Sequence, residues 1–337
     1  MIDFRSDTVT LPTPAMLAFM QEAPIGDDVF GEDPSINALE AKTAALFGME
    51  AGLFCPSGTM TNQLAIKTHT QAGDEVICEE LSHIYQYEGG GIASNSGCSV
   101  KLLKGNRGRI TANQVLAAIN PEDVHKPISR LVSLENTCNR GGGACYNFSE
   151  IESIHKVAKS NGLGMHLDGA RIFNALVHKK EDSTQYGKVF DSISICLSKG
   201  LGAPVGSVLI GSTAFIKKAR RWRKVFGGGM RQAGSLAAAG IFALDHHVER
   251  LKEDHIKALL LKDALIKKDF VQAVFEVETN IVIAHIEGKY NATALVAALK
   301  EKNILAIAMA PALVRFVLHL DISQDMLLNT LETIEKL

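Results

Sequence analysis

The fold of this chain is decided by one stretch of its sequence, which reads Ser194-Ile195-Cys196-Leu197-Ser198-Lys199-Gly200-Leu201-Gly202-Ala203-Pro204. The apolar residues at its start are typical of a short buried strand, and the glycines and the proline at its end prevent a simple continuation of strand or helix. Lys199 lies at the boundary between the two parts. A lysine held among apolar residues loses hydration, which favours a neutral, nucleophilic amine that forms Schiff bases. The alternative is a solvated surface lysine in a strand-to-turn junction.

A second apolar run ends in the carboxylate of Asp168, and Arg171 follows it closely. In an open α/β sheet the carboxyl ends of the strands meet at one crevice, so we expect Asp168 and Lys199, which end successive strands, both to face that crevice. Pyridoxal phosphate requires both groups, because its aldehyde condenses with a lysine and its ring nitrogen needs a carboxylate that keeps it protonated. Asp168 could instead cap a helix that opens near Ala170.

Strands and helices alternate along most of the chain. This alternation is typical of an α/β fold with a doubly wound, mostly parallel sheet. From about residue 247 the pattern changes to long helices and scattered strands, which predicts a smaller C-terminal α+β domain. We therefore expect a large, cofactor-binding domain with an N-terminal arm at residues 1–246 and a small domain at residues 247–337.

The N-terminal arm, residues 1–35, is polar and rich in turns. It is too long for a mere connection, which suggests a segment draped over a site or over a partner subunit. A flexible tail is the alternative. Phe4, Val9, Val29 and Phe30 argue against a tail, because disorder requires no apolar anchors.

The composition argues against several classes of partner. The 337 residues carry a net charge of -2 without a long basic block, so neither nucleic acid nor an anionic membrane surface is the expected partner. No apolar run resembles a signal peptide or is long enough to span a bilayer, so a cytoplasmic location is expected. The six cysteines show no C-x-x-C spacing, which predicts neither a zinc site nor a disulfide framework, and we expect no metal.

Two segments supply candidate residues for binding a cofactor. Ser57, Gly58 and Thr59 precede an expected helix, where small residues let backbone N–H groups approach a phosphate. A plain Ser/Thr cap explains the same residues. His83 follows a strand at residues 75–79 and could lie against the cofactor ring or move protons. A loop histidine with a satisfied hydrogen bond is the alternative.

Two arginines are candidates for binding anions. Arg315 lies within an apolar strand, where an unpaired charge is costly, so it should meet either a substrate carboxylate or a structural acidic partner. Arg231 follows three glycines, which form either a flexible hinge or a turn that brings the arginine to a phosphate.

Together these residues resemble a known family, the pyridoxal-phosphate-dependent L-threonine aldolases of low specificity. The resemblance runs from residue 3 to the C-terminus and rests on several separate motifs in the same order. They are residues 5–10, 26–34, 57–62, 166–171, 198–201 and 227–232, which read RSDTVT, GDDVFGEDP, SGTMTN, HLDGAR, SKGL and GGGMRQ.

The resemblance implies an aspartate-aminotransferase-like fold and a homotetramer whose active sites lie between subunits. It implies that Lys199 forms the Schiff base with the cofactor, that Asp168 pairs with the pyridine nitrogen and that His83 stacks on the ring. The implied phosphate site consists of Gly58 and Thr59, with Arg231 supplied by a neighbouring subunit. The substrate carboxylate would be held by Ser6, Arg171 and Arg315, with Arg171 also beside the cofactor.

The reaction that the resemblance implies is retro-aldol cleavage of the Cα–Cβ bond of L-threonine, L-allo-threonine and related β-hydroxy-α-amino acids, which releases glycine and an aldehyde. Two residues depart from the family pattern. Cys138 stands where the family usually has a histidine near the substrate hydroxyl, and Phe30 stands where tyrosine is usual. A thiol does not replace an imidazole as a hydrogen-bonding group, so either His83 or a water transfers the proton, or the substrate preference has changed.

Two other classes of protein are alternatives to the aldolase. Another pyridoxal-phosphate enzyme on the same fold, a β-eliminating lyase or an aminotransferase, would account for the altered Cys138 and Phe30. A nucleotide-binding α/β protein without this chemistry fares worse. The chain has neither a G-x-G-x-x-G motif at its first strand-to-helix turn nor a G-x-x-x-x-G-K-[ST] motif.

Overall fold

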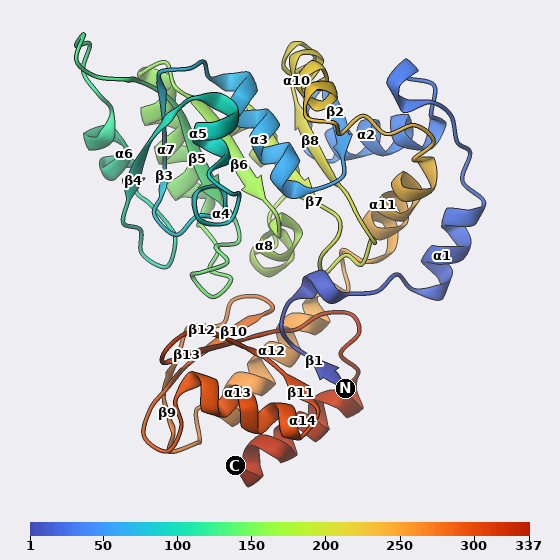
Figure 1. Cartoon of the computed structure of the whole chain (residues 1–337), viewed down its shortest axis with the longest axis vertical. Helices are drawn as coiled ribbons and strands as arrows, with labels where there is room; N and C mark the ends of the chain where they lie inside the picture. The colour runs from blue at the N-terminus through green and yellow to red at the C-terminus, as the bar shows by residue number, and fades with distance from the viewer.

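A seven-stranded sheet forms the centre of the larger lobe in the computed structural model, which describes residues 1–337 (Figure 1). The strands follow the order β2-β8-β7-β6-β5-β3-β4 across the sheet. β8 runs antiparallel to both neighbours, and every other neighbouring pair is parallel. The predicted α/β fold with a mostly parallel sheet is therefore confirmed. The strand bounds are β2 Ala51–Cys55, β3 Asp74–Glu79, β4 Ser99–Leu103, β5 Ile128–Glu135, β6 Gly164–Gly169, β7 Ser192–Cys196 and β8 Ser207–Gly211.

Helices cover both faces of this sheet. α3 (Gly58–His69) crosses one face in contact with β6, β7 and β8, and α10 (Thr213–Val225) packs beside it. On the opposite face, residues such as Leu167 and Ile193 join the largest hydrophobic core together with α7 and α8. No helix has the length and apolar character needed to cross a membrane. The remaining helices of this lobe, α7 and α8 included, are η1 Asp7–Val9, α1 Pro14–Gln21, η2 Asp28–Phe30, α2 Pro34–Leu46, α4 His83–Gln86, α5 Gly91–Ser96, α6 Ala112–Ala118, α7 Phe148–Ser160, α8 Ile172–Lys179, α9 Ser183–Val189 and α11 Gly234–His246.

The smaller lobe has a four-stranded antiparallel sheet in the order β12-β13-β10-β9 and a core of its own. The N-terminal strand β1 (Ile2–Asp3) pairs with β11 of this lobe (Figure 1), and Phe4 is buried in its core. The expected division at residue 246 therefore has an exception, because the first residues of the chain lie with the C-terminal lobe. The elements of this lobe are α12 Leu251–Leu265, β9 Val271–Val274, β10 Ile281–Ile286, α13 Ala292–Glu301, β11 Ile304–Leu305, β12 Ile307–Ala310, β13 Leu313–Val317 and α14 Gln324–Lys336.

Neighbouring strands β5, β6 and β7 share a polar face beneath α3. Side chains alternate along a strand, and residues that pair in register point to the same side. Val132, Leu134, Met165, Leu167, Ile193 and Ile195 therefore enter the main core, whereas the polar residues between them face α3. Two registered rows of buried polar residues result, Ser133–His166–Ser192 and Glu135–Asp168–Ser194. The second row lies at the carboxyl ends of the strands, where the predicted crevice is.

Candidate active site

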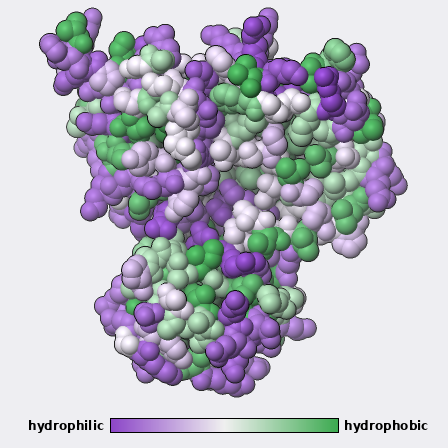
Figure 2. All heavy atoms as spheres, viewed as in Figure 1, coloured by the Kyte–Doolittle hydropathy of each residue, from purple (hydrophilic) through white to green (hydrophobic).

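A polar pocket of about 310 Å³ is lined by residues of both lobes. Figure 2 shows hydrophilic surface in the recess between the two lobes. Five residues singled out in the sequence line this pocket together: Ser6, His83, Arg171, Lys199 and Arg315. The remaining lining residues are Thr8, Tyr87, Asn139, Arg140, Ile307 and Met309.

Lys199 reaches the pocket from a turn that follows β7. The N–H of Gly202 donates to the carbonyl of Lys199 at 2.8 Å, and Gly202 has a φ of 79°, a conformation that favours glycine. Gly200 lies close to the small lobe, since a Cβ there would be 3.3 Å from a methyl of Leu251. The lysine is therefore presented to the pocket by a tight turn. It is neither a freely solvated surface lysine nor a member of an ion pair.

Asp168 is buried at the end of β6 and uses its two oxygens differently. Oδ1 accepts the N–H of Ala170 at 3.1 Å, which supports the turn before α8, as the capping alternative expected. Oδ2 accepts a hydrogen bond from Asn62 Nδ2 of α3 at 3.0 Å. Because only 2% of the residue is exposed, the carboxylate is shielded from solvent, and each oxygen, with one hydrogen bond, keeps a second lone pair for a further donor.

His83 opens α4 beside this carboxylate. Its Nδ1 lies 2.9 Å from Glu88 Oε1, and its backbone N–H donates to Glu135 Oε2 at 2.7 Å. Burial alone would lower the pKa of His83, but the hydrogen bond to Glu88 and the charge of Asp168 outweigh it, so the pKa is raised. His83, Glu88 and Asp168 place one potential metal-ligand atom each within 4.8 Å of one another. The short His83–Glu88 hydrogen bond accounts for part of this proximity.

Sequence reasoning missed three carboxylate and amide residues of this site: Asn62, Glu88 and Glu135. Glu88 accepts hydrogen bonds from Asn62, Gln63 and His83. Burial, aided by the nearby Asp168, raises the pKa of Glu135 to about 7. A signal for Glu135 existed, because it ends a strand as Asp168 does. Nothing local in the sequence pointed to Glu88 or Asn62.

Arg171 is held by the N-terminal arm. Its Nε and Nη2 donate to the two oxygens of Asp7 at 2.7 and 2.6 Å, and both side chains are buried. Burial alone opposes ionisation of Asp7, but the adjacent guanidinium of Arg171 lowers its pKa to about 2. The arm is therefore anchored and is not a flexible tail. One nitrogen of Arg171, Nη1, is left for a ligand.

Arg315 lies on β13 without an acidic partner. Its Nη1 donates to Asn139 Oδ1 and its Nη2 to the carbonyl of Arg5, both at 3.0 Å, while Nε is buried with no partner. Burial and the neighbouring Arg171 lower the pKa of Arg315 to about 10. The structural ion pair considered as an alternative is absent, so the arginine favours an anion from outside the chain.

The start of α3 has the features of a phosphate cradle. Ser57 Oγ caps the helix by accepting the N–H of Met60 at 3.1 Å, so the capping interpretation holds for this hydroxyl. The first N–H groups of a helix have no partner within it, which leaves those of Gly58 and Thr59 for a ligand. A Cβ on Gly58 would lie 3.4 Å from Ser207 Oγ, a buried hydroxyl without a partner. A lysine, a buried carboxylate and this cradle fit pyridoxal phosphate.

Arg231 and the two departures from the family pattern lie outside the pocket lining. Arg231 pairs with Asp27 at 3.0 Å, and 57% of its side chain is exposed. Its role at the phosphate of a neighbouring subunit stays a prediction. Phe30 is 73% exposed. Cys138 is buried, with its thiol donating to the carbonyl of Glu135 at 3.1 Å and its side chain against Gly108.

Comparison with known proteins agrees with this geometry. A family model described as β-eliminating lyase matches residues 3–289. The low specificity L-threonine aldolase of Escherichia coli (strain K12) is 42% identical over 328 residues, which cover 97% of this chain and 96% of that protein. The probable low-specificity L-threonine aldolase 2 of Arabidopsis thaliana is 42% identical over 343 residues, which cover 100% and 97%. This chain belongs to the low-specificity L-threonine aldolase family.

Solved structures share the fold of this family member. Threonine aldolase of Leishmania major superposes with a TM-score of 0.88 at 21% identity and covers 100% of this chain and 99% of that one. A putative L-allo-threonine aldolase of Listeria monocytogenes superposes with a TM-score of 0.81 at 19% identity and covers 99% and 96%. Membership of the family makes the protein a pyridoxal-phosphate-dependent lyase.

Proposed function

We propose that this enzyme cleaves L-threonine, L-allo-threonine and related β-hydroxy-α-amino acids into glycine and an aldehyde. The observation that carries this proposal is the pocket itself, which brings Lys199 together with two arginines, Arg171 and Arg315. Arg315 has no acidic partner in this chain. An amino acid needs both features, because its amine must reach the cofactor while its carboxylate is bound nearby.

The substrate carboxylate is assigned to Arg315, Arg171 and Ser6. Arg315 has a buried Nε without an acceptor, and Arg171 keeps Nη1 free while Asp7 fixes its other nitrogens. Two fixed guanidinium groups hold a carboxylate in one orientation. Orientation matters because the held carboxylate would fix which bond at Cα is presented for cleavage.

Pyridoxal phosphate, when bound, supplies an aldehyde that condenses with amines and a ring that accepts the electron pair of the cleaved bond. Lys199 would hold the cofactor through its amine, in the pocket that the substrate amine must also reach. Asp168, which is buried, would pair with the ring nitrogen and keep it protonated. Gly58 and Thr59 hold the phosphate with their N–H groups, and Ser57 and Ser207 support that end of the site.

His83 is assigned to the ring face and to the proton of the substrate β-hydroxyl. Glu88 only accepts hydrogen bonds when ionised, so His83 Nδ1 carries the proton that lies between them, at an Nδ1–Oε1 distance of 2.9 Å. The lone pair of neutral His83 is then on Nε2. A raised pKa makes this nitrogen a stronger base, which suits removal of the hydroxyl proton as the Cα–Cβ bond breaks.

The active enzyme is further proposed to be a cytoplasmic homotetramer. Phe30, 73% exposed, and Arg231, with 57% of its side chain exposed, present apolar and cationic groups that a second copy would cover. The tetramer would bring Arg231 of each copy to the phosphate of a neighbour. Sedimentation equilibrium tests this part, since a protein that stays monomeric with full activity would exclude it.

The decisive experiment measures acetaldehyde release from L-threonine and from L-allo-threonine with added pyridoxal phosphate. Release that disappears in Lys199→Ala supports the proposal. Formation of a 2-oxo acid without aldehyde would instead favour a β-eliminating lyase or an aminotransferase, the second candidate. The observation behind that candidate is the absence of an imidazole at position 138. The ratio of the two rates measures the preference between diastereomers.

A further inference from the structure

A chain of buried hydrogen bonds runs beneath α3 from Asp168 toward the amino ends of the strands. Asp168 Oδ2 lies 3.0 Å from Asn62 Nδ2, and Asn62 Oδ1 lies 3.1 Å from His166 Nε2. His166 Nδ1 lies 2.9 Å from Ser192 Oγ, which lies 2.8 Å from His69 Nε2. The reaction described above uses neither histidine.

The direction of every hydrogen bond in this chain follows from its carboxylate end. Asn62 Nδ2 faces two carboxylates, Asp168 at 3.0 Å and Glu88 at 2.8 Å, so this atom is the amide nitrogen and donates to both. Asn62 Oδ1 is then an acceptor, and His166 Nε2 must donate to it. The first two hydrogen bonds, counted from Asp168, therefore both have their donor on the side away from the carboxylate.

The same reasoning continues through the two histidines. His166 is fully buried, which lowers its pKa to about 3, and burial lowers the pKa of His69 to about 4, so both rings are neutral and carry one N–H each. With its proton on Nε2, His166 accepts at Nδ1 the hydroxyl proton of Ser192. The Ser192 oxygen in turn accepts the Nε2–H of His69. All four donors point toward Asp168.

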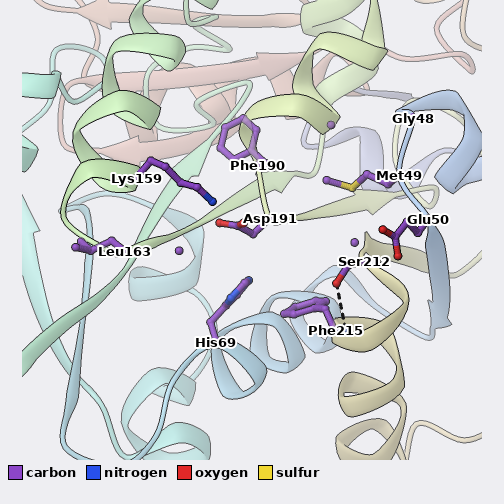
Figure 3. A pocket seen from close by; sticks show the side chains of 14 residues that line it. Gly48, Met49, Glu50, His69, Lys159, Leu163, Phe190, Asp191, Ser212 and Phe215 are labelled. Atoms are coloured by element: carbon purple, nitrogen blue, oxygen red, sulfur yellow. Dashed lines mark hydrogen bonds between the residues drawn. The ribbon is translucent and has the colours of Figure 1, made fainter.

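The outer end of the chain is fixed by packing. His69 lies at the edge of a second pocket of about 590 Å³, where its ring contacts that of Phe215 with a centroid distance of 4.5 Å (Figure 3). A Cβ on Gly164 would lie 3.3 Å from His69 Nδ1, so glycine leaves room for the ring. Packing against Phe215 and Gly164 therefore holds the His69 ring in the orientation that the chain of hydrogen bonds requires.

We propose that Asn62, His166, Ser192 and His69 are positioning residues, which form a one-way chain of donors that keeps Asp168 oriented toward the ring nitrogen of the cofactor. A reversed His166 tautomer would place two lone pairs against each other at Asn62 Oδ1. A rotated Asn62 amide would set its oxygen against two carboxylates. Each link therefore excludes the arrangement that would weaken the donor to Asp168. The proposal rests on the proposed function, because it concerns the same cofactor.

The test compares the binding of two ligands to purified protein: pyridoxal phosphate and its analogue with carbon in place of the ring nitrogen. His166→Leu is expected to weaken binding of pyridoxal phosphate about tenfold and Ser192→Ala about threefold, while each changes binding of the analogue less than twofold. The matched control is Ser133→Ala, which removes a serine hydroxyl on the other side of His166 in the same row. It should change neither affinity.

A second readout needs no variant. Nitrogen-15 NMR of histidine-labelled wild-type protein without cofactor should show His166 and His69 as neutral Nε2–H tautomers. An Nδ1–H tautomer or a charged ring at His166 would overturn the proposal, as would equal losses for both ligands or no loss in either variant. If wild-type protein binds no pyridoxal phosphate, the proposed function fails. If wild-type protein binds it and the variants do not discriminate, the donor chain alone fails.

Discussion

Replacing Arg315 by methionine is expected to separate substrate binding from stability. Burial lowers the pKa of Arg315 to about 10, so the folded state disfavours its charge by about 3 kcal/mol. Below pH 10 the guanidinium is charged in both the folded and the unfolded chain, so this penalty is fully present at neutral pH and is relieved only as the pH rises above 10.

Methionine removes that penalty but leaves two acceptors, Asn139 Oδ1 and the carbonyl of Arg5, without their donor. Each unmade hydrogen bond costs about 1 kcal/mol, so the variant should be more stable than wild type by about 1 kcal/mol. Loss of a charge-assisted hydrogen bond to the substrate carboxylate, about 1.5–3 kcal/mol, should lower kcat/KM for L-threonine by about 10- to 100-fold.

Urea unfolding of the cofactor-free protein at pH 7 and one fixed protein concentration measures the first effect, and acetaldehyde release measures the second. The matched control is Arg130→Met, which removes a partly exposed arginine that pairs with Asp74 outside the pocket. It should lose less than about 1 kcal/mol and keep its activity. An Arg315→Met variant that is destabilised by more than about 2 kcal/mol, or that keeps wild-type kcat/KM, would refute the reasoning.

Four other substitutions test separate parts of the site. Lys199→Ala should remove both the absorption band of the bound cofactor and acetaldehyde release, and a normal spectrum would contradict its role. Asp7→Asn should cost about 3–5 kcal/mol in urea unfolding because Arg171 is left buried and unpaired, whereas Asp3→Asn, which loses a partly exposed pair with Arg5, should cost under about 1 kcal/mol. Burial raises the pKa of Glu135 from 4.5 to about 7, so the folded state holds a proton that the unfolded chain releases between these values, and stability falls as pH rises through this window. Glu135→Gln should flatten that slope in unfolding at pH 5, 6 and 7, and an unchanged slope would exclude Glu135 as its source. Cys138→Ala should leave the ratio of L-threonine to L-allo-threonine turnover unchanged, because its thiol faces the carbonyl of Glu135, and a shifted ratio would place this residue at the substrate.

Local sequence determined the sheet and the groups at its edge. The short runs that end at Asp168 and before Lys199 become neighbouring parallel strands, because buried strands that alternate with helices are typical of a mostly parallel sheet. Ser57 forms the expected cap, and Arg315, charged within an apolar strand, has no acidic partner in the chain. Such features are visible in sequence because they depend on spacing along a few consecutive residues.

The tertiary structure alone decided which distant residues support these groups. Asp7 reaches Arg171 across 164 positions of sequence, and Asn62 reaches Asp168 across 106. The alternation of His166 with Leu167 and of Ser192 with Ile193 shows that one face of these strands is polar. The alternation does not reveal which helix covers that face. α3 covers that face and supplies Asn62 and His69. Buried polar groups must find partners, and the partner is set by which helix packs on the sheet, a choice that no short segment encodes.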